Sequence, residues 1–349
     1  MFIISYGCYI WEFHLVLYII KFKNCCYYTK IFIFESVLFY RLVDIIIVSY
    51  YDKISLKWIR KVTLINVFPL NMKYNRLLMS FPKYFDVIHY NLNVHMTMSR
   101  NVNKQLAHRQ WGDLFNILQS NNIRVDLIPP KKNLVDMVFT ANGALIYKNL
   151  AIVSKYKALP RQGETECYVD YLKSQNYDVY KMRNYFEGTG DGIFSHSKNH
   201  LWLGHGFRSD SNSSNEIKNV LNDDGVKIHS LKLIRPEWYH LDTCFCPIGD
   251  GKLLLFDKAF DDESLNEIYS VYDDKDIVNV SENDALNFAC NSICIGDDNH
   301  SILIGHKFSD ELKERVKKLG ITKIIENDMS EFLLSGGSVR CSVLDVEVR

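Results

Sequence analysis

The sequence predicts an α/β fold built from a repeated strand and helix unit. From Lys83 onward, short runs of β-branched and aliphatic residues alternate with segments of helical hydrophobic spacing, which is typical of α/β domains. These groups recur at intervals of about fifty residues, and such a period indicates a repeated supersecondary unit. The same alternation also permits a doubly wound parallel sheet.

The individual elements follow from hydrophobic spacing. A helix is expected over 103–119 because Leu106, Trp111 and Leu114 recur at helical intervals. A strand is expected over 125–128, ending at Pro129. A strand is also expected over 85–88, a hairpin over 144–147 and 150–153, and a helix over 164–175. Three strand and helix pairs follow: 201–203 with 216–221, 252–256 with 265–271, and 301–304 with 308–319.

Residues 1–71 differ in composition from the rest. They contain no Ala and no Gln, whereas Phe, Ile, Tyr, Leu and Lys are frequent, as expected from translated AT-rich DNA. Two segments, 2–20 and 31–49, are long and apolar enough for a membrane anchor, but charged residues such as Glu12 and Asp44 interrupt them. We therefore expect an extension that is not part of the enzyme.

Charge and cysteine content narrow the partners and the compartment. Lys plus Arg equals Asp plus Glu at 41 each, so no charge excess indicates nucleic acid or an anionic membrane as the main partner. Nine cysteines at irregular spacing, without an evident signal peptide, favour a reducing compartment over a disulfide framework. We expect a cytoplasmic protein, and a homo-oligomer is left open.

Three distant segments bring nucleophilic and acid–base side chains into one chain. Cys341 ends the run 336–341, Glu187 and Asp191 lie in the run 186–191, and His240 begins the run 240–247. A thiol, an imidazole and carboxylates suit attack on a guanidinium carbon, because the thiolate is the nucleophile and carboxylates bind a planar cation. The competing zinc site of His240, Cys244 and Cys246 is disfavoured by the Cys-x-Cys spacing, and we expect both cysteines in the core.

These motifs, with Asp136 to Asn142, carry a resemblance to the guanidine-modifying (pentein) superfamily. The sequence is most similar to arginine dihydrolases of the cyanobacterial type and next to dimethylarginine dimethylaminohydrolases, over roughly residues 79–349. The resemblance implies a five-fold pseudosymmetric α/β propeller with a central active site. It also implies that 79–349 is the catalytic domain and that 1–78 is the extension, with Met72 or Met79 as the natural start.

The resemblance also implies roles for particular residues. Cys341 is the nucleophile, His240 the general acid and base, and Glu187 and Asp242 bind the guanidinium, as does Asp191. If the segment after His240 is extended, Asp242 shares its face. Further residues that the resemblance places around the substrate are Arg161 and Arg208 at the α-carboxylate, Asn142 at the reacting group, and Asn93.

Asn142 decides between the reactions of the superfamily. Arginine deiminases have an acid at the corresponding position, whereas Asn142 matches the dihydrolase pattern. An amide offers an acceptor and two donors without charge, so it can also bind neutral citrulline. We therefore expect a hydrolase that converts free arginine to ornithine, ammonia and CO2 without metal or cofactor. The alternatives are a dimethylargininase or deiminase that releases citrulline, and a binding protein similar to a ribosome anti-association factor.

Overall fold

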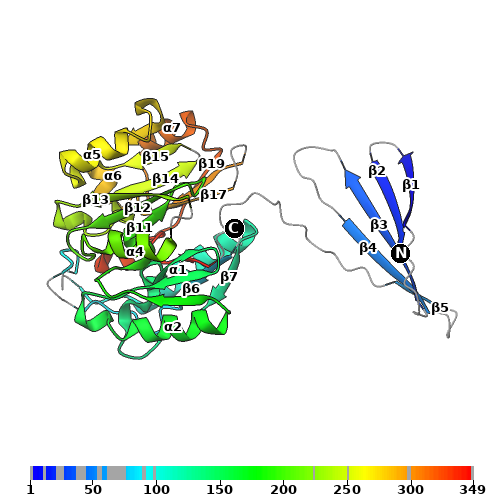
Figure 1. Cartoon of the computed structure of the whole chain (residues 1–349), viewed down its shortest axis with the longest axis horizontal. Helices are drawn as coiled ribbons and strands as arrows, with labels where there is room; N and C mark the ends of the chain where they lie inside the picture. Colours follow the sequence, from blue (N-terminus) through cyan, green and yellow to red (C-terminus); the bar gives the residue numbers. More distant parts are fainter. Residues whose placement is uncertain are drawn as a thin grey trace. The chain divides into compact units, whose positions relative to one another are not determined.

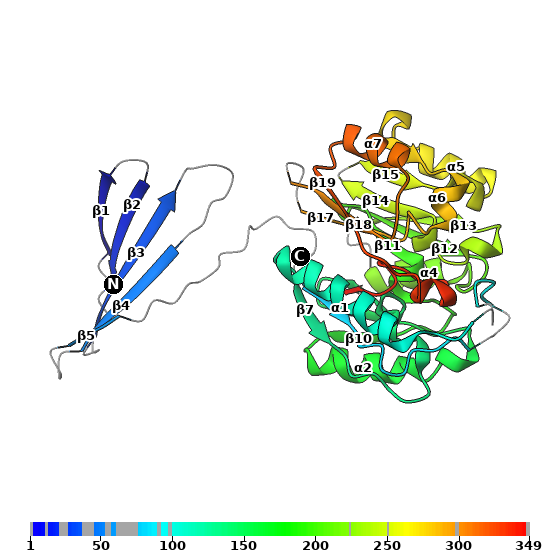
Figure 2. The same ribbon diagram turned by 180° about the vertical axis from the view of Figure 1, so that it is seen from behind.

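The computed structural model divides the chain into two compact units, Met1–Leu70 and Asn71–Arg349 (Figures 1 and 2). It describes the backbone of five strands between residues 3 and 60, and it describes residues 76–88, 92–96, 100–222, 225–249, 251–296 and 300–346 with their side chains. Within these residues, no helix has the length and hydropathy needed to cross a membrane.

The first unit contains an antiparallel sheet whose strands follow the chain order β1-β2-β3-β4-β5. Both apolar segments of the sequence contribute strands to this sheet, but their side chains lie outside the described residues. The expectation that this unit is not part of the enzyme stays a prediction. The strands are β1 (Ile3–Ile10), β2 (Phe13–Ile20), β3 (Tyr27–Ser36), β4 (Ile45–Asp52) and β5 (Lys57–Arg60).

The second unit repeats one supersecondary motif. An antiparallel strand pair is followed by a helix and by a third strand parallel to the second, so that each repeat forms a three-stranded sheet. Four repeats are continuous in sequence. The first two consist of β8 (Ala144–Tyr147), β9 (Leu150–Val153), α2 (Glu164–Ser174) and β10 (Asp178–Lys181), and of β11 (Gly192–Phe194), β12 (His200–His205), α4 (Ser213–Leu221) and β13 (Lys227–Lys232). The next two consist of β14 (Phe245–Gly249), β15 (Lys252–Leu255), α5 (Asp262–Tyr269) and β16 (Ile277–Asn279), and of β17 (Ile293–Ile295), β18 (Ile302–Gly305), α7 (Asp310–Lys318) and β19 (Lys323–Glu326).

The fifth sheet is assembled from both ends of the second unit. Its second and third strands are β6 (Arg76–Met79) and β7 (Arg124–Leu127), joined through α1 (Lys104–Ser120), and its first strand is β20 (Leu344–Asp345). The described strands of this unit thus form five small sheets, and the predicted repeat is confirmed. The alternative of one doubly wound sheet is wrong, because these strands do not pair across repeats.

Helix α2 lies at one edge of the unit, and α5 and α7 lie at the other, in both views (Figures 1 and 2). The strands between them are buried. In β6, Leu77 and Met79 pack into one hydrophobic cluster and Leu78 into another, since successive side chains point to opposite faces. Burial on both faces explains why these strands read as continuous apolar runs.

Most predicted elements are confirmed, with ends that differ by a few residues. Capping side chains set several starts: the Asp261 carboxylate accepts from the Ser264 N–H at 3.0 Å, so α5 begins earlier than predicted. The strand predicted over 85–88 is wrong. Phe85 is buried in the core, but β6 occupies the place between β7 and β20, and Pro82 after it cannot continue a ladder.

The boundary predicted between residues 78 and 79 falls inside β6. A chain beginning at Met79 would lack Arg76, Leu77 and Leu78, and the two leucines are fully buried. The unit that carries the motifs begins at Asn71, next to Met72, the other predicted start, which itself lies outside the described residues. Which start is used stays a prediction.

We expect a chain beginning at Met72 to fold and a chain beginning at Met79 to fail. Removing two buried leucine side chains costs about 2 to 5 kcal/mol each, and the central strand of a sheet is lost with them. Soluble yield and thermal unfolding of the two proteins provide the measurement. Equal stability of both chains would show that β6 is dispensable.

Candidate active site

Four candidate site residues, each from a different repeat, lie just before the first strand of their sheets. Asn142 precedes β8, Asp191 precedes β11, Asp242 precedes β14 and Cys341 precedes β20, in short helical turns or tight turns. The equivalent position before β17 holds Asn291, which the sequence analysis did not identify. The repeats therefore deliver one polar side chain each from a structurally equivalent position.

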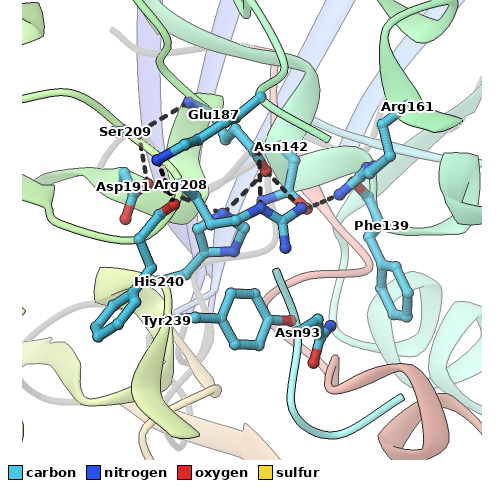
Figure 3. A network of polar contacts seen from close by, with 12 residues as sticks. Asn93, Phe139, Asn142, Arg161, Glu187, Asp191, Arg208, Ser209, Tyr239 and His240 are labelled. Carbon is cyan, nitrogen blue, oxygen red and sulfur yellow. Dashed lines mark hydrogen bonds and ion pairs between the residues drawn. The ribbon is translucent and has the colours of Figure 1, made fainter. Parts of the chain in front are cut away.

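Glu187 lies between two basic side chains (Figure 3). The Arg208 Nε and Nη2 atoms contact Oε1 and Oε2 of Glu187 at 3.0 and 2.9 Å, and His240 Nε2 lies 3.0 Å from Oε2. All three side chains are buried. Burial alone raises the pKa of Glu187, but Arg208 and the hydrogen bond from His240 outweigh it and hold the pKa well below its usual range.

The pairing with Glu187 sets the orientation of the imidazole. An ionised carboxylate only accepts hydrogen bonds, so His240 Nε2 carries the proton of this contact. His240 Nδ1 then has its lone pair free in the neutral ring, and this buried atom has no partner among the described residues. Nδ1 is therefore the atom that can exchange a proton with a bound molecule.

Asp191 supports the backbone of the site. Its Oδ1 accepts from the Leu241 N–H at 3.0 Å, and its Oδ2 accepts from Ser209 Oγ at 2.5 Å. Burial raises the pKa of Asp191 to about 6, although these hydrogen bonds lower it in part. Both oxygens thus contact protein groups, so in this arrangement Asp191 orients the segment after His240.

Asn142 is held by Arg161 (Figure 3), and Arg161 is itself paired with the buried Glu164. Arg161 Nη1 donates to Asn142 Oδ1 at 2.8 Å, and its Nε and Nη2 atoms bind Glu164 at 2.9 and 2.8 Å. A guanidinium only donates, so the atom facing it must be the amide oxygen. The Asn142 NH2 group consequently faces away from Arg161, and it is buried without a partner among the described residues.

Cys341 lies beside Asp242. The Cys341 thiol donates to Asp242 Oδ2 at 3.3 Å, while the buried Asp242 Oδ1 lacks a partner within the described chain. Burial raises the pKa of Asp242 to about 7, and burial followed by the negative charge of Asp242 raises the pKa of Cys341 well above its usual range. Without a bound cation, the pair therefore retains the thiol proton.

The expected extended segment after His240 is wrong. His240 itself has extended backbone angles, but Leu241–Thr243 forms a 3-10 turn because the Thr243 N–H and Oγ1 both donate to the His240 carbonyl. The turn directs Asp242 toward Cys341 rather than leaving it on the face of His240. The expected core position of Cys244 and Cys246 is confirmed, since both belong to the hydrophobic cluster around β14 and β15.

Asn93 is buried and connects two loops. Its Nδ2 donates to the Ser335 carbonyl at 2.9 Å, and its Oδ1 accepts from the His95 N–H at 3.0 Å. The Tyr239 hydroxyl donates to the neighbouring Gly336 carbonyl at 2.7 Å, and Figure 3 places Tyr239 beside Asn93. Asn93 is thus near the turn that leads to Cys341. Its predicted contact with substrate stays a prediction, as do those of Arg161 and Arg208.

Gly190 provides space between two of the unpartnered atoms. A Cβ atom at this position would lie 2.2 Å from Asn142 Nδ2 and 3.3 Å from His240 Nδ1. Any side chain would therefore displace the amide. A flat, nitrogen-rich molecule can form hydrogen bonds with all three unpartnered groups, which are the Asn142 amide donor, the His240 ring nitrogen and the Asp242 Oδ1 acceptor.

The raised pKa of Asp242 makes a pH-dependent contribution to stability. Its folded-state pKa, about 7, lies above the ordinary value of 3.8, so the folded state binds the proton more tightly. The contribution is present below the ordinary pKa and is lost as pH rises toward about 7, with a slope of at most about 1.4 kcal/mol per pH unit. We expect the free energy of unfolding of wild type minus that of Asp242→Asn to fall over this range. A difference independent of pH in denaturant titrations would contradict the assignment.

Five strand and helix repeats that deliver a thiol, an imidazole and buried carboxylates define an α/β enzyme of the guanidine-modifying superfamily. Residues 88–348 match the family described as N,N dimethylarginine dimethylhydrolase, eukaryotic, and the chain belongs to this family. The predicted superfamily and the predicted class, hydrolases of linear amidines, are thereby confirmed. The alternative of a non-catalytic binding protein is not supported.

Three similar proteins indicate the range of this family. The chain is 35% identical to the bifunctional arginine dihydrolase/ornithine cyclodeaminase AgrE of Nostoc sp., over 78% of the chain but 38% of AgrE. It is 30% identical to the N(G),N(G)-dimethylarginine dimethylaminohydrolase of Mycobacterium tuberculosis, over 78% of the chain and 85% of that protein. The N-terminal domain of ArgZ, crystallised as a variant covalently bound to a reaction intermediate, superposes with a TM-score of 0.73 at 34% identity, over 78% of the chain and 97% of the domain.

Proposed function

We propose that the chain is an arginine dihydrolase, which hydrolyses the guanidinium of free arginine twice and releases ornithine. The observation that carries this proposal is the unpartnered, buried NH2 group of Asn142. A guanidinium offers only donors, so it cannot satisfy another donor. The ureido oxygen of citrulline can accept from this group, and a site that binds citrulline can act on it again.

The first round begins with the thiol. A guanidinium next to Asp242 offsets the negative charge that raises the pKa of Cys341, so binding of the substrate favours the thiolate. The Cys341 thiol gives its proton to His240 Nδ1, the resulting sulfur anion attacks the guanidinium carbon, and the C–N bond to a terminal nitrogen breaks. The departing nitrogen takes a proton from His240 Nδ1 and leaves as ammonia, which gives an S-alkylthiouronium.

Water then resolves the covalent intermediate. His240, neutral after the first transfer, accepts a proton from water as the oxygen adds to the same carbon. Cleavage of the C–S bond then gives citrulline, the second proton of the adduct passes to the sulfur, which leaves as the thiol, and His240 releases its proton to solvent. Glu187 keeps the ring oriented through Nε2 in both steps, because its low pKa keeps it ionised. Arg208 stabilises that charge.

The second round uses the same groups on a neutral substrate. Attack on the ureido carbon releases the second ammonia and leaves a thiocarbamate on Cys341. Hydrolysis of this thiocarbamate gives the carbamate of ornithine, which loses CO2. Arginine and two waters are thus converted to ornithine, two ammonia molecules and CO2. Asn142 donates to the ureido oxygen in this round, where negative charge accumulates during attack.

We also propose that the five sheets close into the five-fold pseudosymmetric propeller. Three features support closure: the sheets share one strand order, their first strands follow the site residues, and β20 pairs with β6. In such an arrangement the five turns meet at one central channel. The contacts between turns from different repeats agree with this, since the Cys341 thiol forms hydrogen bonds with the side chains of Asp242 and Asn291.

The proposal is tested by the products that the full chain forms from arginine. A dihydrolase accumulates ornithine and ammonia in a ratio of one to two with little free citrulline. Release of citrulline alone would favour a deiminase, and activity on methylated arginine with citrulline as product would favour a dimethylargininase, the activity named for the mycobacterial relative.

A further inference from the structure

Asn291 contacts the nucleophile more extensively than any residue predicted from the sequence. It lies between α6 (Glu282–Leu286) and β17, and its side chain is fully buried. Its Nδ2 donates to the Cys341 sulfur at 3.1 Å, and its Oδ1 accepts from the backbone N–H groups of Cys341 and Ser338 at 3.2 and 3.1 Å. Its own carbonyl accepts from the Arg340 N–H at 3.1 Å.

The orientation of the Asn291 amide follows from its partners. Two backbone N–H groups can only donate, so the atom between them must be the oxygen. The NH2 group therefore faces the sulfur, and it also donates to the Asp242 carbonyl at 3.2 Å. One amide thus joins the loop of the nucleophile to the turn that carries Asp242.

The two polar neighbours of the sulfur favour opposite protonation states. Asp242 accepts a hydrogen bond from the thiol, and its negative charge opposes ionisation of the thiol. A donor such as Asn291 Nδ2 instead stabilises the thiolate. A donor at 3.1 Å from the sulfur is also close enough to restrict the direction in which the sulfur lone pairs point.

We propose that Asn291 is a positioning residue that acts through Cys341, holding the sulfur beside Asp242 and stabilising the thiolate that attacks the substrate. Its importance for turnover rests on the proposed function, but its effect on the thiol does not. A residue that only joins the loops would change stability without changing thiol ionisation. The ionisation of Cys341 therefore separates the two roles.

Alkylation by iodoacetamide, followed for each cysteine by peptide mass spectrometry across pH, reports that ionisation in the full chain. Asn291→Asp keeps an acceptor for the two backbone N–H groups but removes the donor to sulfur. Asn291→Ala removes the donor without adding charge, so it separates the loss of the donor from the added charge of Asn291→Asp, and it carries the test alone if Asn291→Asp does not fold. Cys167, half-buried in α2, is an internal reference in every sample.

Asn327→Asp is the matched control. Asn327 is also buried and its Nδ2 also donates to a backbone carbonyl and to a sulfur, those of Gln110 and Met329, both at 3.1 Å. It therefore reproduces the general cost of replacing a buried amide by an acid. Thermal unfolding of all variants measures that cost separately from thiol ionisation.

We expect alkylation of Cys341 at a fixed mildly alkaline pH to slow about tenfold to hundredfold in both Asn291 variants, with the pH profile displaced upward by about one to two units. The Asn327 variant and the Cys167 reference should not change. Unaltered Cys341 profiles in folded Asn291 variants would overturn the inference. A displaced profile in a protein that does not hydrolyse arginine would support this inference and refute the proposed function.

Discussion

Replacing Cys341 by serine is expected to lower arginine turnover by at least about three orders of magnitude while arginine still binds. The covalent step needs an anion at this position, and a hydroxyl is far harder to ionise than a thiol in the same buried site beside Asp242. Asp242 and Asn142, which contact the substrate in our proposal, are unaltered, so affinity should change little. Turnover is followed by ammonia release and binding by calorimetry.

Cys167→Ser is the control for this experiment. Cys167 is also a free cysteine, but it lies in α2 with its thiol directed to the Gly163 carbonyl, so its replacement should leave turnover unchanged. A Cys341→Ser protein that retained a tenth of wild-type turnover would exclude Cys341 as the nucleophile. Loss of both turnover and arginine binding would indicate a misfolded site instead.

The motifs predicted the reactive groups because Cys341 and Glu187 lie in glycine-containing runs and His240 lies close to Asp242 and two cysteines. Cys341, Glu187 and His240 could be found in this way, and the structure connects Glu187 to His240 and Cys341 to Asp242. What the pattern could not supply was the local backbone. The 3-10 turn at Leu241–Thr243 depends on contacts to the His240 carbonyl, which hydrophobic spacing does not report.

Asn291 was missed because no motif surrounds it. It lies between Cys290 and Ser292, directly before a short apolar run that is typical of an ordinary strand. Its signal is the repeat itself: Asn142 lies two residues before β8 and Asn291 two residues before β17. Superposing the repeats in sequence would have pointed to this position, whereas inspection of each segment alone could not.

The strand β6 was missed for a different reason. Its four residues, Arg76–Met79, follow directly on the compositionally biased region, and they pair with β7 and with the distant β20. A short apolar run gives little evidence of a strand when its partners are far away in sequence. Tertiary pairing, which local patterns do not encode, decides both this strand and the domain boundary.

Asn142→Asp is expected to convert the enzyme from release of ornithine to release of citrulline. The variant removes both donors of the amide and adds negative charge where the ureido oxygen of citrulline would bind. The lost hydrogen bond and the repulsion are worth about 1 to 3 kcal/mol, a loss of roughly tenfold to hundredfold in the second round. The first round acts on a cation, which an additional carboxylate attracts, so it should be less affected.

The position of Arg161 strengthens this expectation. In wild type its Nη1 fixes the amide oxygen of Asn142 at 2.8 Å, and in the variant the same atom would bind one carboxylate oxygen and leave the other facing the site. The shape of the side chain is kept, so the product rather than the fold should change. Asn327→Asp, which buries a new acid away from these groups, controls for a general loss of stability.

Chromatography of citrulline and ornithine over time, for wild type and both variants, gives the decisive comparison. Wild type and Asn327→Asp should accumulate ornithine, while Asn142→Asp should accumulate citrulline at a rate close to its arginine consumption. Citrulline as the only product of wild type would refute the dihydrolase proposal, because the Asn142 donor would then serve no second round. Ornithine from Asn142→Asp at the wild-type rate would show instead that another group contacts the ureido oxygen, and the role of Asn142 would have to be withdrawn.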